Sequence, residues 1–134
     1  RFNVSAAIDI AYLMLESGES RQAEILLEKI YTVAETMPLL GFNGTWVGNA
    51  PVYALRGDRR EALAELRRAV DAGWRAEWWY TFDKDPVFES LRDEPEFQAM
   101  RAEVAADMAA QLARVHEMEA SGEIPAPEAG QRDQ

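Results

Sequence analysis

One short stretch of this chain occurs twice, and that repeat limits the folds that the chain can adopt. Residues 18–23 read GESRQA and residues 57–62 read GDRREA. The same offset aligns further apolar positions: Leu27 with Leu66, and Ile30 with Ala69. In each copy a Gly lets the chain reverse, a small Ala lets a second helix come close to the first, and a Leu one turn later fills the groove between them. The repeat therefore predicts two units, at about 3–36 and 46–73, each an antiparallel pair of helices.

Apolar residues recur at helical spacing through both units. In the first helix they lie at i, i+3, i+4 and i+7: Ile8, Ala11, Tyr12 and Leu15. The second helix begins near Ser20 and ends at Met37-Pro38, because a residue before proline disfavours helical geometry. A short helix over 50–56 follows a loop rich in Gly and Asn. A fourth helix starts after Asp58, which we expect to cap it with Glu61 as the capping-box partner. No segment alternates as a strand does, so we predict an all-α fold.

Large aromatic side chains gather just after the second unit. Five of the 13 aromatic residues fall within nine positions: Trp74, Trp78, Trp79, Tyr80 and Phe82. A last repeat has no following neighbour to cover its open side, so we predict an aromatic-rich cap and a long last helix over 74–120. That helix, from about Glu96 to Ala120, has its apolar residues on one side: Phe97, Met100, Val104, Met108, Leu112, Val115 and Met118. The Gly- and Pro-rich residues 121–134 predict a disordered tail.

At the repeated positions the sequence resembles the tetratricopeptide repeat (TPR), whose pattern W-x2-L-G-x2-Y…A-x3-F…P spans about 34 residues. The matching positions of the second unit are Trp46, Asn49, Ala50, Tyr53, Ala62 and Leu66. Those of the first unit are Ala7, Ile10, Ala11, Met14, Ala23 and Leu27. The offset exceeds the period by about five residues, which fit into the loop at 39–48. The resemblance implies a TPR-like α-solenoid of stacked helix pairs that binds other proteins.

Residues 50–104 resemble, more narrowly, the terminal repeat region of bacterial multidomain signalling proteins. The shared segments are residues 54–58 (ALRGD), 72–74 (AGW), 78–79 (WW) and 85–97 (DPVFESLRDEPEF). In that family an adenylate cyclase, winged-helix or kinase domain precedes a TolB-like segment and the repeats. The resemblance implies a regulatory or interaction module rather than a catalytic domain. Because the chain opens at Arg1-Phe2 without Met, we expect it to be part of a longer protein.

Composition opposes several classes of function. The chain contains no Cys and a single His, His116, which excludes thiolate catalysis, disulfides and multi-histidine metal sites. Its 24 acidic and 14 basic residues give a net charge of −10, which opposes binding to nucleic acid or anionic membrane. No apolar stretch approaches the roughly 20 residues of a membrane-spanning helix. We expect no cofactor, no nucleic acid, no membrane contact and no enzymatic activity, and we favour the cytoplasm over the periplasm.

The predicted architecture also indicates where a partner binds. In stacked helix pairs the first helix of each pair lines a concave face, across which a peptide lies. We expect seven residues on this face: Ser5, Ile8, Asp9, Tyr12 and Glu16 from the first unit, and Ala54 and Leu55 from the second. Two units and a cap fall below the usual three repeats, so we expect either a homodimer or stabilisation by upstream repeats. The candidate self-association residues are Met100, Met108, Leu112, Val115 and Met118.

Three further groups of residues leave alternatives open. The Trp78/Trp79 region suggests either packed core or the pocket of a small-molecule sensor that regulates an attached enzyme. The acidic residues Asp83, Asp85 and Glu89 suggest either a cation site or helix capping, and their spacing favours capping. Four arginines suggest either a phosphate site or a salt-bridged surface, which the interleaved acidic residues favour: Arg59, Arg60, Arg67 and Arg68.

Overall fold

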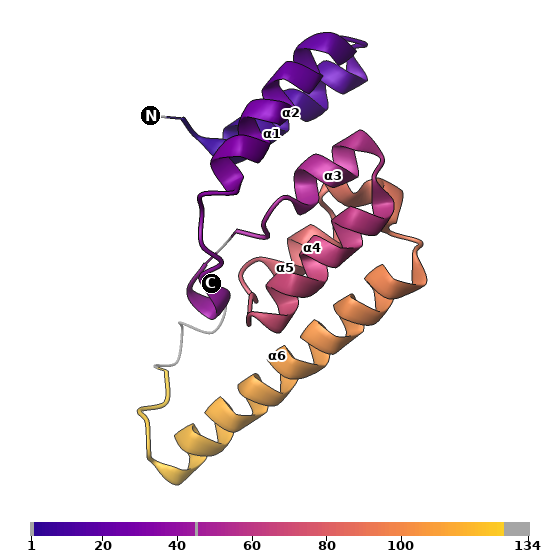
Figure 1. Cartoon of the computed structure of the whole chain (residues 1–134). Coiled ribbons are helices and arrows are strands. Elements are labelled where there is room, and N and C mark those ends of the chain that lie inside the picture. Colours follow the sequence, from indigo (N-terminus) through magenta and orange to yellow (C-terminus); the bar gives the residue numbers. More distant parts are fainter. Residues whose placement is uncertain (1, 45, 128–134) are drawn as a thin grey trace.

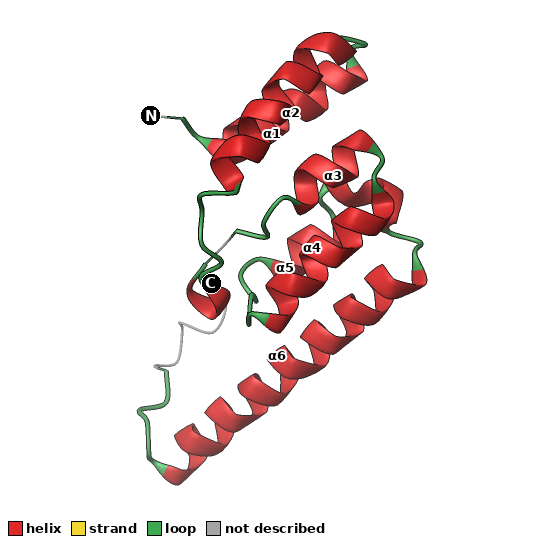
Figure 2. Ribbon diagram, viewed as in Figure 1, coloured by secondary structure: helices red, strands yellow, loops and turns green. Residues whose placement is uncertain are grey.

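The computed structural model describes residues 2–44 and 46–127, and every regular element in that part of the chain is helical (Figures 1 and 2). In chain order the elements are α1 (Val4–Glu16), α2 (Ser20–Ala34), the 3-10 helix η1 (Gly41–Asn43), α3 (Ala50–Arg56), α4 (Arg59–Asp71), α5 (Trp78–Asp83), the 3-10 helix η2 (Pro86–Leu91) and α6 (Pro95–Ser121). The described residues contain no strand, which confirms the all-α prediction.

Two glycines form the turns within the two helix pairs. Gly18 and Gly57 both have φ of +80°, a left-handed geometry that costs a residue with a side chain more than it costs glycine. The turns make the same backbone hydrogen bond. The Glu19 N–H donates to the carbonyl of Met14 at 2.8 Å, and the Asp58 N–H donates to the carbonyl of Tyr53 at 2.9 Å. These are Schellman turns, which end a helix while satisfying its last carbonyls.

Three positions in the second helix of each pair, related by the repeat offset, are buried in both pairs. Ala23 and Ala62 are fully buried, as are Leu27 and Leu66, and so are Ile30 and Ala69. The small Ala lies in α2 and in α4, each of which packs against the helix before it. The repeated residues therefore play the same structural part twice.

The helix pairs are layered rather than joined end to end (Figure 1). Helix α3 contacts both α1 and α2, so the second pair rests on the first. In the same way η2 contacts both α3 and α4, and α6 contacts α4 and α5. The segment that the sequence predicts as a cap is thus a third, irregular layer, in which α5 and η2 together precede the long helix α6.

Part of the aromatic cluster forms the core of this third layer. The rings of Phe82 and Phe97 meet edge to face with centroids 4.9 Å apart, and those of Trp74 and Phe82 lie 6.0 Å apart. All three side chains are buried. Trp79 and Tyr80 are instead exposed, so the cluster is divided between core and surface. Only the buried residues of the aromatic cluster therefore cover the end of the core as the sequence predicts.

The predicted capping box at the start of α4 does not form. Asp58 is the N-cap residue, but its side chain accepts no hydrogen bond from the first turn. Its ψ of 69° lies outside the extended region that an N-cap residue usually adopts, because the tight Gly57 turn immediately precedes it. The carboxylate of Glu61 pairs instead with Arg60 at 3.0 Å.

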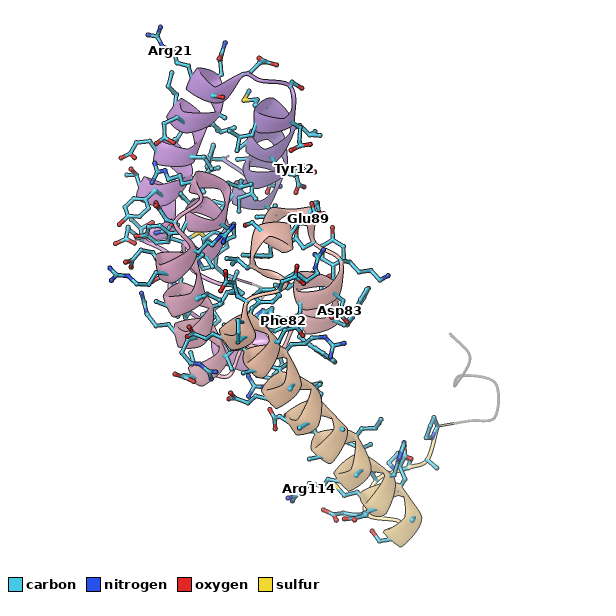
Figure 3. The ribbon with its side chains drawn as sticks, turned by 90° about the vertical axis from the view of Figure 1, so that its right-hand side faces the viewer. Tyr12, Arg21, Phe82, Asp83, Glu89 and Arg114 are labelled. Carbon is cyan, nitrogen blue, oxygen red and sulfur yellow. The ribbon has the colours of Figure 1, made fainter. Side chains whose placement is uncertain are left out.

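Helix α6 has a buried beginning and an exposed end. Phe97, Met100 and Val104 are buried, whereas Leu112 and Val115 are 56% and 40% exposed. Figure 3 shows the later turns of α6 extending away from the other helices. The assignment of Met100 to a self-association surface is therefore wrong, because this side chain packs inside the core.

The end of α6 enters the region that the sequence predicts as a disordered tail, over 121–134. Ser121 is the last helical residue and Gly122 is its left-handed C-cap. The N–H of Glu123 donates to the carbonyl of Met118 at 2.9 Å. Residues 128–134 of the predicted tail lie outside the described part of the chain.

Candidate partner-binding groove

The predicted partner-binding residues line two adjoining depressions between α1 and the α5–η2 segment. The first has a volume of about 340 Å³ and contains Ser5, Ile8 and Asp9 of α1. The second has a volume of about 410 Å³ and contains Tyr12, Glu16, Ala54 and Leu55. Val87 of η2 lines both. We call the two depressions together the acidic groove.

The periodicity of α1 explains why its polar residues line this groove. Val4, Ala7, Ile8 and Ala11 are buried, and they form the face of α1 that packs into the core. Successive residues of a helix are about 100° apart, so Ser5, Asp9, Tyr12 and Glu16 form a neighbouring strip at spacings of four, three and four. Figure 3 shows Tyr12 beside Glu89 of η2, across the second depression. The strip is the wall of the groove that α1 supplies.

Two predicted contact residues are less accessible than a partner-binding role requires. Ile8 and Ala54 are both buried, so they belong to the floor of the groove and leave little surface for a partner. Their place on an open concave face is therefore a wrong prediction, although both still border the groove.

The opposite wall comes from residues that sequence reasoning did not assign to the site. The first depression is also lined by Trp46, Glu77, Tyr80, Thr81, Asp85 and Phe88. The second is also lined by Leu15, Pro86, Glu89 and Ser90. The feature of the sequence that could have indicated this wall was the group of acidic residues near the aromatic cluster. Periodicity does not show that α5 and η2 lie across the groove from α1, because these helices are too short to display an apolar stripe.

Among the described residues, every charged side chain that lines the groove is acidic. The five carboxylates are Asp9, Glu16, Glu77, Asp85 and Glu89. None of them forms an ion pair with a described residue, whereas many carboxylates elsewhere pair with arginine. For example, Arg67 pairs with Glu103 at 2.7 Å and Arg68 with Glu65 at 2.6 Å. The predicted salt-bridged arginine surface is thus present, and the groove lacks such pairing.

Burial and the neighbouring carboxylates raise the pKa values of two residues in the groove, Asp85 and Tyr80. Burial raises the pKa of the Asp85 carboxyl and the charge of Asp9 raises it further, against the hydrogen bond from the Val87 N–H and the charge of Arg92. That hydrogen bond, 3.0 Å long, makes Asp85 the N-cap of η2. The charge of Asp85 is also the main cause of the raised pKa of Tyr80. A bound cation would relieve both effects.

Backbone strain coincides with the same wall. Glu77 has φ of +51° and is the one non-glycine residue with positive φ in the described part of the chain. Such geometry costs about 1–3 kcal/mol and gathers at functional sites. Glu77 is the N-cap residue of α5, and Tyr80 and Thr81 in the following helix line the groove.

The alternatives that the sequence left open are also resolved in part. Asp83 forms a two-point ion pair with Arg101 across α5 and α6, so it does not join Asp85 and Glu89 in a cation site. No cluster of three or more acidic or histidine side chains in the described residues is arranged to hold a metal ion.

Trp78 and Trp79 line neither depression. Within the described residues no helix is both long and apolar enough to cross a membrane.

Comparisons with known proteins give no further identification. Searches against protein-family models, curated proteins and solved structures find no match.

Proposed function

We propose that this chain is a non-enzymatic protein-interaction module whose acidic groove binds a basic peptide segment of a partner protein. The observation that supports this most strongly is the set of five unpaired carboxylates along one groove. Like charges held together at a partly desolvated surface are unfavourable until a cation joins them. A lysine or arginine side chain supplies that charge.

The groove also suits the rest of a basic side chain. Tyr80 and Trp46 provide aromatic surface beside the carboxylates of the first depression. Aromatic faces attract ammonium and guanidinium groups, and they also pack against the apolar stem of these side chains. The volume of about 340 Å³ is at the lower end of small-ligand pockets, which is sufficient for one side chain. The second depression offers room for the residues that follow.

We further propose that the helix pairs are TPR-like units, which the resemblance of the sequence implies. The matched burial across the repeat offset and the contact of α3 with both helices of the first pair support this. Asn49 and Val52 of the second unit are 2% and 0% exposed beneath the first pair. Their equivalents Ile10 and Leu13 are 47% and 60% exposed. The outer face of α1 thus has the character of a surface on which another pair stacks. We place the module in the regulatory part of a larger bacterial signalling protein.

Binding of short basic peptides tests this function directly. We expect a fluorescent peptide containing Lys and Arg to bind, and a peptide with Glu at the same positions not to bind. Asp9→Asn and Asp85→Asn are each expected to weaken binding about fivefold to tenfold, as for the loss of one ion pair of about 1 kcal/mol. Anisotropy titration at low and high salt measures these changes, and higher salt should weaken binding.

Glu117→Gln is the matched control, because it removes the same charge from the exposed end of α6. It should leave the affinity unchanged. Equal affinity for the basic and acidic peptides, or equal effects of Asp85→Asn and Glu117→Gln, would contradict a binding site in the groove.

A further inference from the structure

The second half of α6 presents apolar side chains that the other described residues leave largely uncovered. From Ala109 to Glu117 every side chain is exposed, including Leu112 and Val115. Met108, Leu112 and Val115 follow one another at spacings of four and three, so they share one side of the helix. We call these three residues the distal stripe, in which Met108 is half-buried against the core and Leu112 and Val115 are exposed.

The distal stripe continues an interface that is already formed. Phe97, Met100 and Val104 lie on the same line of the helix, and they pack into the third layer. The line of apolar residues therefore extends past the end of the other helices. The projecting segment extends a helix whose first half is held by packing, and the apolar side chains of Leu112 and Val115 remain exposed to water unless a neighbour covers them.

Charged residues beside the stripe indicate which neighbour fits. Asp107 and Arg114 are seven residues apart, so they lie on the same flank of the stripe two turns from each other. Arg114 forms no ion pair or hydrogen bond with a described residue, and Figure 3 shows it on the projecting part of α6. Asp107 pairs with Arg75 at 2.5 Å, and its side chain is still 38% exposed. Because a carboxylate can accept more than one hydrogen bond, Asp107 can also accept one from a second donor.

We propose that the distal stripe is a homodimer interface, in which α6 packs antiparallel against α6 of a second copy. A two-fold axis near Leu112 places the two Leu112 side chains together, and it places each Met108 close to Val115 of the second copy. The same flank of each helix then faces its copy, so each Arg114 approaches Asp107 of the other chain. The interface is self-complementary in both shape and charge.

The overall shape of the chain favours the antiparallel arrangement. Helices α4 and α5 lie beside the first half of α6, and its last turns project beyond the other helices (Figure 1). Antiparallel pairing puts the two bodies at opposite ends of the paired helices. Parallel pairing would bring both bodies to the same end. The groove between α1 and η2 is formed without α6, so the dimer and the peptide-binding site are independent.

The oligomeric state of the full chain tests this interface. Sedimentation equilibrium at high micromolar concentration should give about twice the chain mass of 15.1 kDa. Leu112→Glu should raise the dissociation constant of the dimer at least about tenfold, since it removes two apolar side chains from the interface centre. Ala110→Glu is the matched control, because residue 110 lies about 200° away around the helix. A monomeric wild-type chain, or equal effects of the two variants, would overturn the proposal.

Cross-linking tests the direction of the pairing, because the native chain has no cysteine. Leu112→Cys should oxidise to a disulfide-linked dimer. Met108→Cys mixed with Val115→Cys should give the hetero-linked product, and neither variant should link to itself. Self-linked Met108→Cys without the hetero-linked product would show parallel helices and overturn the antiparallel arrangement. Asp85→Asn should leave the dimer unchanged, so the result does not depend on peptide binding.

Discussion

At the scale of single residues, environment decides the role more than residue type does. Leu13 and Leu27 are both leucines at helical positions of the first unit, yet one is 60% exposed and the other is buried. Asp83 and Asp85 are two residues apart, and their pKa values move in opposite directions. Hydrogen bonding to Arg101 lowers the pKa of Asp83, whereas burial raises that of Asp85. The carboxylate that forms no ion pair with a described residue is the one in the groove.

This contrast predicts the effect of Asp85→Asn on stability. Because the pKa of Asp85 is higher in the folded chain, its ionisation costs stability once the pH exceeds the unfolded pKa, and the cost disappears at lower pH. The asparagine can still accept the hydrogen bond from Val87. We expect the variant to be more stable at about pH 7, by less than about 1 kcal/mol because the site is partly exposed, and equal to wild type near pH 3. Urea unfolding at the two pH values measures this.

A variant less stable at neutral pH, or a gain that persists in acid, would contradict this origin of the Asp85 shift.

At the scale of elements, glycine and proline made the helices predictable. Gly18 and Gly57 end α1 and α3, and Pro51 lies in the first turn of α3, as expected from its fixed φ. The bounds of α3 and α4 and the start of α2 follow the sequence prediction, whereas α2 ends at Ala34 and not at the predicted Met37-Pro38. The capping box of Asp58 was mispredicted, because the residue types were right but the turn before them set a different backbone angle. Long periodic helices were therefore easier to predict than the details of their ends.

Substitutions at the repeated leucines test the equivalence of the two helix pairs. Leu27→Ala and Leu66→Ala should each lower the free energy of unfolding by about 2–5 kcal/mol, since both side chains are fully enclosed. Leu13→Ala should change it by less than about 0.5 kcal/mol, because Leu13 is exposed on the outer face of α1. Chemical unfolding of the three variants measures the differences. A cost at only one of the two buried leucines would show that the two pairs are not equivalent.

At the scale of the whole molecule, the arginine–carboxylate pairs and the unpaired carboxylates lie in different places. Arginines link separate elements, as Arg56 does with Glu24 and Glu28, and as Arg75 does with Asp107. In the described part of the chain, the groove between α1 and η2 is lined by carboxylates and by no arginine. The polar strip of α1 could be predicted from periodicity. The other wall could not, because it depends on the chain returning over α1 through two short helices that have no repeat partner.

The most direct test of the peptide-binding proposal is a titration of the isotopically labelled chain with a Lys- and Arg-containing peptide, followed by NMR. The backbone amide shifts of Asp9, Tyr12, Tyr80 and Asp85 should change with a single saturable dependence, because these residues line the two depressions. The amides of the exposed α6 segment from Ala109 to Glu117 should stay unchanged. Shifts that are absent at the groove residues, or that are spread over α6 with no saturation, would contradict a specific basic-peptide site between α1 and η2.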